Sequence, residues 1–465
     1  MKKKIISSVA AAMALSLFMT SCGAHGPAYD INSVVTSGKS ILKPVPIADN
    51  PNFVSNNYTS IPATAETAEA VFSSSDGLCV IEKKPSYYDV TLDYTGGDYY
   101  KAGAAYGEAI MLARPDYVEY MEPYIYENIT MAFPGVNDYE GVKLRCDEIF
   151  GTLDEKYRQE ILGISETMGE GEGFVKDGII SRDEMILAQL IPDVLRGTSC
   201  SSISINGNNT ASGKRISCRI LEWPLGTENQ MCEVHTVFHS VNGDKSYTSV
   251  SVLGFLTILT AVNDNGVMIG EHDVGGGSVY EFEGRKSYTY GLRYALESFE
   301  TAREAAEHLA ANASSYTFSA NILVTDENDA LCVEQCVLEE CGRTVIRDSS
   351  TPLHKGLEWD DPNCLCVVNT FAVDGNMDQM TDNRANIDRW EKYNRLFSGE
   401  TGLTLDRFKE LITSEKTDTE LVNIRSNNVV HMVIANYDTK KIQAVLTGTE
   451  GVVDTPEFVD LGSWE

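Results

Sequence analysis

One cysteine and two charged residues stand where the sequence could support nucleophilic chemistry. Cys200 lies in the run 197–202 (GTSCSS), where predicted helices give way to predicted strands. Arg219 and Glu222 follow three residues apart at the end of an apolar segment, and charges in such a place need partners. A guanidinium lowers the pKa of a nearby thiol, and a carboxylate can orient an amine. The alternative is a structural ion pair at the end of a strand.

The residues around Cys200 resemble the start of the mature catalytic chain in the N-terminal-nucleophile hydrolases. Cys-Ser-Ser-Ile at 200–203, with Arg219-x-x-Glu222-Trp223 after it, is similar to the acyl-coenzyme A:6-aminopenicillanic-acid acyltransferases. Choloylglycine hydrolases, penicillin V acylases and acid ceramidase-like enzymes belong to the same group. Further segments resemble that group's motifs in the same order along the chain: 160–169, 263–267, 321–334, 368–371 and 386–391. The resemblance covers about 95–465.

This resemblance implies self-cleavage between Ser199 and Cys200, which leaves a free α-amine on the residue that carries the thiol. An α-amine has a pKa of about 7.7–8.0 and can accept the thiol proton near neutral pH. By the resemblance, Cys200 is nucleophile and base, Glu222 holds the amine and Arg219 supports the thiolate. Asn369 positions the amine or donates to the oxyanion, and Arg389 closes the charge network.

The chain departs from the family pattern at several positions. Glu222 replaces an aspartate, and Cys218 replaces the glycine that usually precedes the arginine. No second oxyanion asparagine is evident after 267–270, where His272 or Asp273 stands as a possible oxyanion or pocket residue. An ionised aspartate cannot donate a hydrogen bond. The alternative interpretation is therefore that this chain has the fold of the group but no catalytic activity.

Neither a metal nor an organic cofactor is expected. The cysteines at 332, 336, 341, 364 and 366 have spacings that match no standard zinc knuckle. Buried thiols, or one or two disulfides, are the interpretation that we favour for them.

The N-terminus resembles a bacterial lipoprotein signal. Three lysines at 2–4 precede an apolar run at 5–18, which is too short to span a bilayer core of ~30 Å as a helix. The run ends in Met-Thr-Ser-Cys-Gly at 19–23, which is similar to a lipobox and predicts acylation of Cys22. The expected location is a bacterial membrane, on its periplasmic or cell-surface side. A plain signal peptide is the alternative.

Composition excludes one class of partner. The formal net charge is -31, and no basic run exists after residue 4, so a nucleic-acid role is not expected.

Four regions are predicted: a signal peptide at 1–21, a tether at 22–80, a helical pro-segment or retained subunit at 81–199, and a catalytic domain at 200–465. Ser181 and Glu184 form a capping box that opens a helix over 185–190, ended by Pro192.

The pattern of helices and strands predicts an α+β fold, a four-layer αββα sandwich with a helical N-terminal segment. We expect a cysteine amidohydrolase or acyltransferase that cleaves linear non-peptide acyl amides through a thioester. Its partners would be a small acyl amide and the membrane, with the pro-segment retained as a second subunit. The alternatives are a lipid amidase or phospholipase B-like hydrolase of the same fold, and an inactive surface-binding lipoprotein. Loops near 225–246 and 272–287 are expected to set specificity.

Overall fold

The computed structural model describes eleven ranges of the chain: 70–133, 139–169, 171–195, 199–274, 283–359, 361–378, 384–413, 424–425, 428–449, 451–453 and 455–464. The signal-like segment and Cys22 lie outside the described residues, as do 196–198 just before Ser199. Lipidation and the N-terminal signal therefore remain predictions. No described helix combines the length and the hydropathy that a membrane crossing requires.

The larger of the two sheets has ten strands. Their spatial order is β1-β2-β3-β6-β7-β8-β9-β10-β11-β12, with only the β3–β6 pair parallel. The strands are β1 (Ala70–Ser73), β2 (Cys79–Lys83), β3 (Tyr88–Asp93), β6 (His235–Val241), β7 (Tyr247–Val252), β8 (Thr260–Asn263), β9 (Met268–Asp273), β10 (Ala320–Thr325), β11 (Ala330–Gln335) and β12 (Val345–Arg347). Strand β1 and the first two residues of β2 fall within the range 22–80 that was predicted to be a tether.

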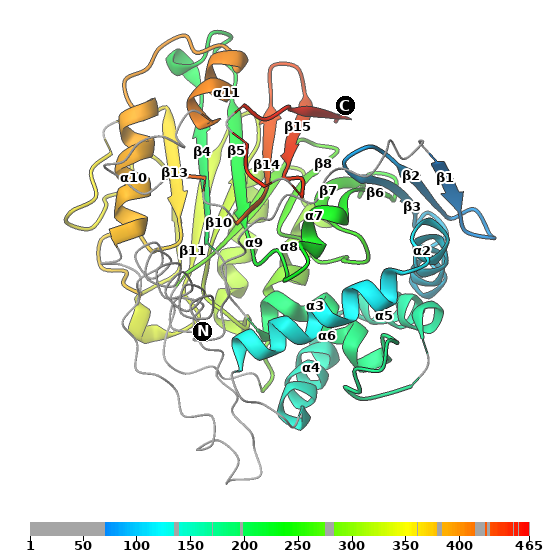
Figure 1. Cartoon of the computed structure of the whole chain (residues 1–465). Coiled ribbons are helices and arrows are strands. Elements are labelled where there is room, and N and C mark those ends of the chain that lie inside the picture. Colours follow the sequence, from blue (N-terminus) through cyan, green and yellow to red (C-terminus); the bar gives the residue numbers. More distant parts are fainter. Residues whose placement is uncertain are drawn as a thin grey trace, which may run out of the picture.

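The second sheet has six strands, all paired antiparallel, in the order β13-β4-β5-β14-β15-β16. They are β13 (Cys364–Val368), β4 (Ser199–Ile205), β5 (Ile216–Glu222), β14 (Val429–Asn436), β15 (Lys441–Leu446) and β16 (Val459–Ser463). Every residue of β5 and β14 is buried, which means that both faces of this sheet are covered. Strand β4 lies in the interior of the sheet, between β13 and β5 (Figure 1).

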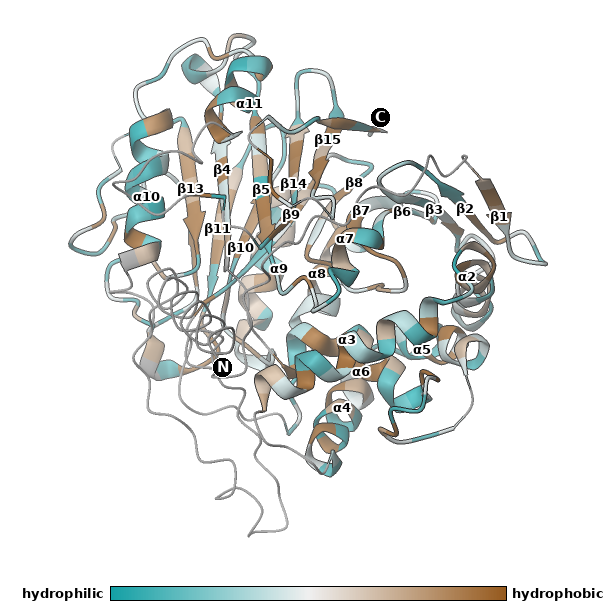
Figure 2. Cartoon of the chain, in the orientation of Figure 1, coloured by the Kyte–Doolittle hydropathy of each residue, from teal (hydrophilic) through white to brown (hydrophobic). Residues whose placement is uncertain are grey.

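The two sheets pack against each other through β4 and β9, and through β13 with β10 and β11. Figure 2 shows strands β5 and β14 mainly in the hydrophobic colour, whereas helices such as α10 carry both colours. This is the pattern expected for strands enclosed on both sides and for helices with one solvent-facing side.

Ten α-helices are described, and some of them pack on the two sheets. They are α2 (Tyr99–Ala113), α3 (Tyr117–Ala132), α4 (Glu140–Thr152), α5 (Glu155–Met168), α6 (Arg182–Val194), α7 (Gln230–Glu233), α8 (Tyr288–Ser298), α9 (Ala302–Asn312), α10 (Arg384–Phe397) and α11 (Leu405–Thr413). Helices α2, α8 and α9 contact the ten-stranded sheet, and α10 contacts β13 and β4. The predicted class, a mixed fold of helices and large sheets, is confirmed.

Helix α6 confirms one local prediction and corrects another. The capping box is present, because Ser181 accepts from the backbone N–H of Glu184 and Glu184 accepts from the backbone N–H of Ser181. The helix was expected to stop before Pro192, yet it continues to Val194. Proline removes one helical hydrogen bond, but Leu195 still donates to the carbonyl of Ile191, and this turn is buried.

Candidate active site

Cys200 and the arginine predicted to assist it lie on neighbouring strands. In the β4–β5 pairing, Cys200 is opposite Leu221 and Ser202 is opposite Arg219. Side chains alternate along a strand, so all four face the same side of the sheet, toward β9 of the other sheet. Cys200 and Arg219 are both fully buried. The pleat therefore places the thiol and the guanidinium together between the two sheets.

Arg219 connects the thiol to the opposite sheet. Its Nη2 lies 3.2 Å from Cys200 Sγ and donates to the backbone oxygen of Glu271 at 2.7 Å. Gly270 leaves room for this side chain, since a Cβ there would stand 2.8 Å from Arg219 Cγ. A buried guanidinium in contact with sulfur favours the thiolate over the thiol.

The backbone of Cys200 is held from both sides. Its N–H donates to Asn369 Oδ1, and its carbonyl accepts from Arg389 Nη1 at 3.0 Å. Asn369 in turn donates through Nδ2 to the backbone oxygen of Asp273 at 2.7 Å and accepts from Arg389 Nη2 at 3.1 Å. The nitrogen that self-cleavage would convert into an α-amine thus already has a fixed partner.

Glu222 completes the group of residues predicted from the sequence. It is the cross-strand neighbour of Ser199, and its Oε2 lies 3.5 Å from Arg389 Nη1. Both side chains are 4% exposed, and Arg389 also donates to Asn386 Oδ1. All five predicted catalytic residues meet around one point: Cys200, Arg219, Glu222, Asn369 and Arg389.

His272 lies close to this group but does not offer an oxyanion donor. Its Nδ1 is 3.0 Å from the backbone oxygen of Asn321, which can only accept, so Nδ1 carries the proton of the neutral ring. Nε2 then accepts from Ser202 Oγ at 2.7 Å. Burial, together with the charge of Arg219, lowers the pKa of His272 to about 3. The ring is therefore neutral at every pH at which an enzyme of this kind would work.

Asp273 contributes its backbone rather than its side chain. Its carbonyl accepts from Asn369, while its Oδ1 accepts from the hydroxyl of Tyr288 at 3.2 Å. Glu271, two residues earlier, is fully buried, and burial together with the nearby Asp273 raises the pKa of its carboxyl well above the usual range. These carboxyl groups alternate with His272 along β9 and so face the opposite side of the strand.

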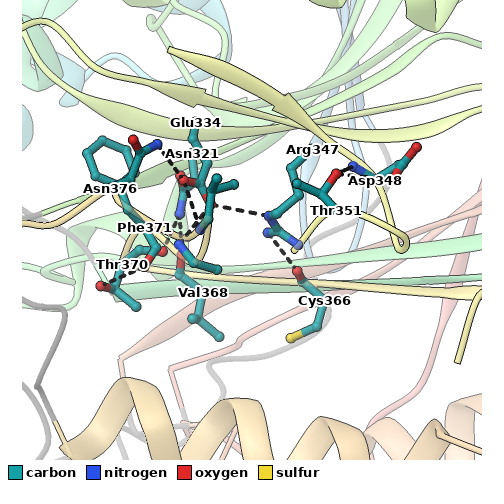
Figure 3. A network of polar contacts seen from close by, with 12 residues as sticks. Asn321, Glu334, Arg347, Asp348, Thr351, Cys366, Val368, Thr370, Phe371 and Asn376 are labelled. Carbon is teal, nitrogen blue, oxygen red and sulfur yellow. Dashed lines mark hydrogen bonds and ion pairs between the residues drawn. The ribbon is translucent and has the colours of Figure 1, made fainter. Parts of the chain in front are cut away.

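A polar network holds the segment that carries Asn369 (Figure 3). Glu334, in β11, accepts from the backbone N–H of Ala372 at 2.7 Å and from Asn376 Nδ2 at 3.0 Å. Arg347 lies 3.2 Å from Glu334 Oε1 and donates to the backbone oxygen of Cys366 at 3.0 Å. This role of Glu334 was not predicted. The available signal was a charged residue inside the apolar run 331–335.

Asn321 supports the same segment from β10. Its Nδ2 donates to the backbone oxygens of Val368 at 2.9 Å and Thr370 at 2.6 Å, on either side of Asn369. Figure 3 shows this amide beside the end of the strand that it holds. The sequence indicated a strand at this position but not this contact. Asn321 and Glu334 are therefore positioning residues for Asn369.

A small, mostly apolar cavity of about 30 Å³ lies near this site, although Cys200 is not among its lining residues. Its wall includes Leu221, the cross-strand neighbour of Cys200, and Trp223. Strand β14 forms another part of the wall, where the pairing with β5 shifts between Val429 and His431. The extra residue, Val430, makes a β-bulge, a feature that often re-aims side chains near active sites.

Among the residues that the structure describes, no three His, Cys, Asp or Glu side chains gather in a way that could hold a metal ion. The described cysteines at 332, 336, 341, 364 and 366 are all buried. Their placement gives no support to a zinc site.

Comparison with known proteins gives structural neighbours only. No protein-family model matches the sequence, and no curated protein matches it. An ortholog of N-acylethanolamine-hydrolyzing acid amidase from Caenorhabditis elegans is 16% identical, with a TM-score of 0.35, over 50% of this chain and 92% of its own.

Two variants of the conjugated bile acid hydrolase from Clostridium perfringens are each 10% identical over 56% of this chain. Their TM-scores are 0.33 and 0.26, over 92% and 84% of their own chains. Sequence identities and TM-scores this low support no conclusion about function. Any such conclusion depends on the arrangement of residues around Cys200. The acid amidase and the bile acid hydrolases both belong to the superfamily that the sequence motifs resemble, the N-terminal-nucleophile hydrolases of the choloylglycine hydrolase group.

Proposed function

We propose that this chain is a self-processing cysteine amidohydrolase that cleaves linear non-peptide acyl amides. The proposal depends on one observation, which is that both the thiol and the backbone nitrogen of Cys200 have polar partners. Arg219 Nη2 lies 3.2 Å from the thiol of Cys200, while Asn369 accepts from the nitrogen of the same residue. A structural ion pair would not require a buried thiol as the partner of the guanidinium.

Self-cleavage would begin at the peptide bond between Ser199 and Cys200. The thiolate of Cys200 attacks the carbonyl carbon of Ser199, the C–N bond breaks, and the nitrogen takes up a proton. Water then hydrolyses the thioester and leaves a carboxylate on Ser199 and a free α-amine on Cys200. Glu222, which is the cross-strand neighbour of Ser199, would stand beside this new amine.

In each turnover the amine of Cys200 would take the thiol proton, since its ordinary pKa of about 7.7–8.0 suits neutral pH. The thiolate then attacks the substrate carbonyl, the amine product leaves with a proton, and a thioester remains. Water, or another acyl acceptor, releases the acyl group. Arg219 stabilises the thiolate, and Asn369 positions the amine or donates to the oxyanion, where one donor is typically worth about 3 kcal/mol.

The proposal also includes predictions about the layers of the fold, the fate of the helical segment and the location of the protein. Helices packed against both sheets support the four-layer αββα order. The helical segment would remain attached after cleavage as a second subunit. Acylation of Cys22 would anchor the mature protein to a bacterial membrane, on the periplasmic side or at the cell surface.

An inactive binding protein is the second candidate. It is favoured by the environment of His272 and Asp273, neither of which presents a hydrogen-bond donor for an oxyanion. Such a protein would remain a single chain and would bind its ligand without consuming it.

The first test is the intact mass, under denaturing conditions, of the protein beginning at Gly23, compared with its Cys200→Ala variant. The matched control is Cys218→Ala, which removes another fully buried thiol from the adjacent strand β5. We expect the wild type and the control to split between Ser199 and Cys200 and to release amine from acyl anilides. The Cys200→Ala variant should do neither. Amide hydrolysis by that variant would contradict the proposal, and a wild type that stays intact and inactive would favour the binding protein.

A further inference from the structure

Two cysteines lie in the connection between strands β11 and β12. Cys336 comes directly after β11, and Cys341 is the last residue of a short 3-10 turn. The two thiols are in hydrogen-bond contact with each other, and both are reduced in this structure. The side chains are 7% and 5% exposed. Sulfur atoms in such contact need only a small movement to form a disulfide bond.

Local hydrogen bonds fix the shape of this connection. The hydroxyl of Thr344 accepts from the backbone N–H of Cys336 at 3.1 Å and donates to its carbonyl at 3.3 Å, which closes the base of a loop over 336–344. Within the loop, the N–H of Cys341 donates to the carbonyl of Leu338 at 3.1 Å. The sulfur of Cys336 lies 3.5 Å from the same carbonyl. The contact between the thiols therefore belongs to one closed loop.

The loop also contacts the segment that follows β13. Asn376 accepts from the backbone N–H of Arg343 at 3.0 Å and donates to its carbonyl at 2.9 Å. The N–H of Met377 donates to the carbonyl of Cys341 at 2.9 Å. A Cβ at Gly342 would collide with Oδ1 of Asn376, so the absence of a side chain allows this close approach. Asn376 belongs to the network of Figure 3 through its bond to Glu334.

The same cysteine pair lies close to the candidate active site. Both side chains pack with Val274 and Phe371 in one small hydrophobic cluster. Phe371 comes two residues after Asn369, and Val274 directly follows Asp273, whose carbonyl accepts from Asn369. The position of Asn369 is therefore coupled to the loop through both the packing and the hydrogen bonds.

We propose that Cys336 and Cys341 form a disulfide bond that holds this loop against the segment carrying Asn369. The oxidant is an external disulfide, such as oxidised glutathione or the disulfide of a protein oxidant, which the proposed extracytoplasmic location would supply. One cysteine thiolate attacks that disulfide and releases a thiolate, and the second cysteine attacks the mixed disulfide and releases the other. One S–S bond forms as one breaks, and two protons and two electrons leave the chain.

The chemistry of the thiols determines when this bond forms. The hydrogen bond with Cys341, together with burial, raises the pKa of the Cys336 thiol. Thiolates are therefore rare in the folded protein at neutral pH, and exchange is slow there. In the unfolded chain the thiols are exposed and close in sequence. We expect the bond to form during folding and to persist afterwards, whether or not the chain hydrolyses amides.

The first experiment maps the bond in the Cys200→Ala protein beginning at Gly23, in which the candidate nucleophile cannot take part in exchange. The protein is exported to a bacterial periplasm, where it folds in the presence of an oxidant, and its remaining thiols are alkylated on lysis. A glutamate-specific protease cleaves after residues 334, 339 and 340, which places the two cysteines on the separate peptides 335–339 and 341–358.

We expect these two peptides to be joined before reduction and to separate after it. Protein made in the reducing cytoplasm should give two alkylated peptides, and the folded reduced protein should be oxidised only slowly by glutathione disulfide. Full alkylation of both cysteines in the exported protein, or a bond from either one to another cysteine, would overturn the proposal.

The second experiment measures what the bond does to the neighbouring segment. Peptides that contain the N–H groups of Arg343 and Met377 should exchange with deuterium at least about tenfold more slowly in the oxidised protein than after reduction. Cys336→Ala and Cys341→Ala should exchange at the fast rate under both conditions. The matched control is Cys146→Ala, which removes a buried thiol from α4 and should keep the slow exchange. Equal exchange in the oxidised and reduced proteins would show that the bond does not hold this segment.

Hydrolysis of acyl anilides by the exported wild type separates this proposal from the proposed function. If the wild type is active, Cys336→Ala should lose activity on heating at a temperature about 2–5 °C lower than Cys146→Ala does. If the wild type cleaves nothing but the two peptides are joined, the disulfide stands and the hydrolase proposal fails. If it cleaves acyl anilides while both cysteines are fully alkylated, the hydrolase stands and the disulfide proposal fails.

Discussion

At the scale of single residues, Cys200 differs from its neighbour Cys218 in the partner of its thiol. Cys218 lies one strand away and is equally buried, and burial raises the pKa of its thiol. Cys200 faces the space between the sheets and touches the guanidinium of Arg219, whereas Cys218 packs in the hydrophobic cluster on the other face of its sheet. The direction of one side chain therefore separates a candidate nucleophile from a packing residue.

Glu222 provides a test of the charge network. Glu222→Gln keeps the shape of the side chain but removes the negative charge opposite Arg389. Because both groups are 4% exposed, the free energy of unfolding should fall by up to about 3 kcal/mol. The proposed amine would also lose its carboxylate, so kcat/KM should fall at least about tenfold.

Denaturant unfolding and acyl anilide kinetics measure these two effects. The control is Glu327→Gln, an exposed residue 3.8 Å from the exposed Lys214, which should change stability by no more than about 0.5 kcal/mol. Full activity in Glu222→Gln would contradict a role for the carboxylate.

The neutral imidazole of His272 predicts a dependence of stability on pH. Its pKa is lowered from the ordinary 6.5 to about 3 in the folded protein, so below pH 6.5 the unfolded chain binds a proton that the folded chain does not. The contribution to stability is present above pH 6.5 and is lost as the pH falls toward 3.

We expect the free energy of unfolding of the wild type, relative to His272→Asn, to fall by about 1.4 kcal/mol for each pH unit between about 6 and 4. Urea unfolding at a series of pH values measures this difference. A constant difference across that range would show that the ring is not held neutral.

At the scale of elements, the site depends on how closely β9 approaches β5. Gly270 lies directly against the Arg219 side chain, and its neighbour Glu271 supplies the backbone oxygen that the guanidinium binds. A larger residue at position 270 would displace the arginine from the thiol without touching Cys200 itself.

Gly270→Ala is therefore expected to lower kcat/KM by about tenfold or more, since the new Cβ would stand 2.8 Å from Arg219 Cγ. The matched control is Gly151→Ala, in α4, where a Cβ meets nothing within 4 Å. That helical change should keep activity and stabilise the protein by about 0.5–1 kcal/mol. Kinetics and thermal unfolding of both variants check the comparison, and an equally active Gly270→Ala protein would refute the role of this close approach.

At the scale of the whole molecule, the segments before and after Cys200 share one hydrophobic core. The largest buried cluster includes residues from β2, α2 and α6 together with residues from β7, β10 and β14. Strand β3 pairs with β6, and Asp193 in α6 accepts from the backbone N–H of Tyr288 at 2.8 Å. Cleavage at one peptide bond would leave all of these contacts in place.

We therefore predict that the two fragments produced by self-cleavage stay together. In size-exclusion chromatography without denaturant, both should elute in one peak at the position of the uncleaved Cys200→Ala protein. In strong denaturant they should separate. Two separate peaks under native conditions would show that the N-terminal segment is a removable pro-peptide.

The order of motifs along the chain was sufficient to predict a mixed fold and to name the five residues that meet at Cys200. These five residues were named through the resemblance of their motifs to a known family. Strand alternation accounts only for the shared face of Cys200 and Arg219, since Glu222, three residues after Arg219, faces the other side of the strand. The same local rules indicated the capping box of α6, since its two partners lie only three residues apart.

Contacts between distant segments were decided only by the tertiary structure. No local pattern could show that Glu334 and Asn321 hold the segment after β13, or that β1 and β2 extend a sheet built mainly from later residues. The same holds for the bulge at Val430, which shapes the cavity from a strand more than 200 residues after Cys200. Local sequence determines which face a side chain takes, but only the packing of the two sheets determines what that face meets.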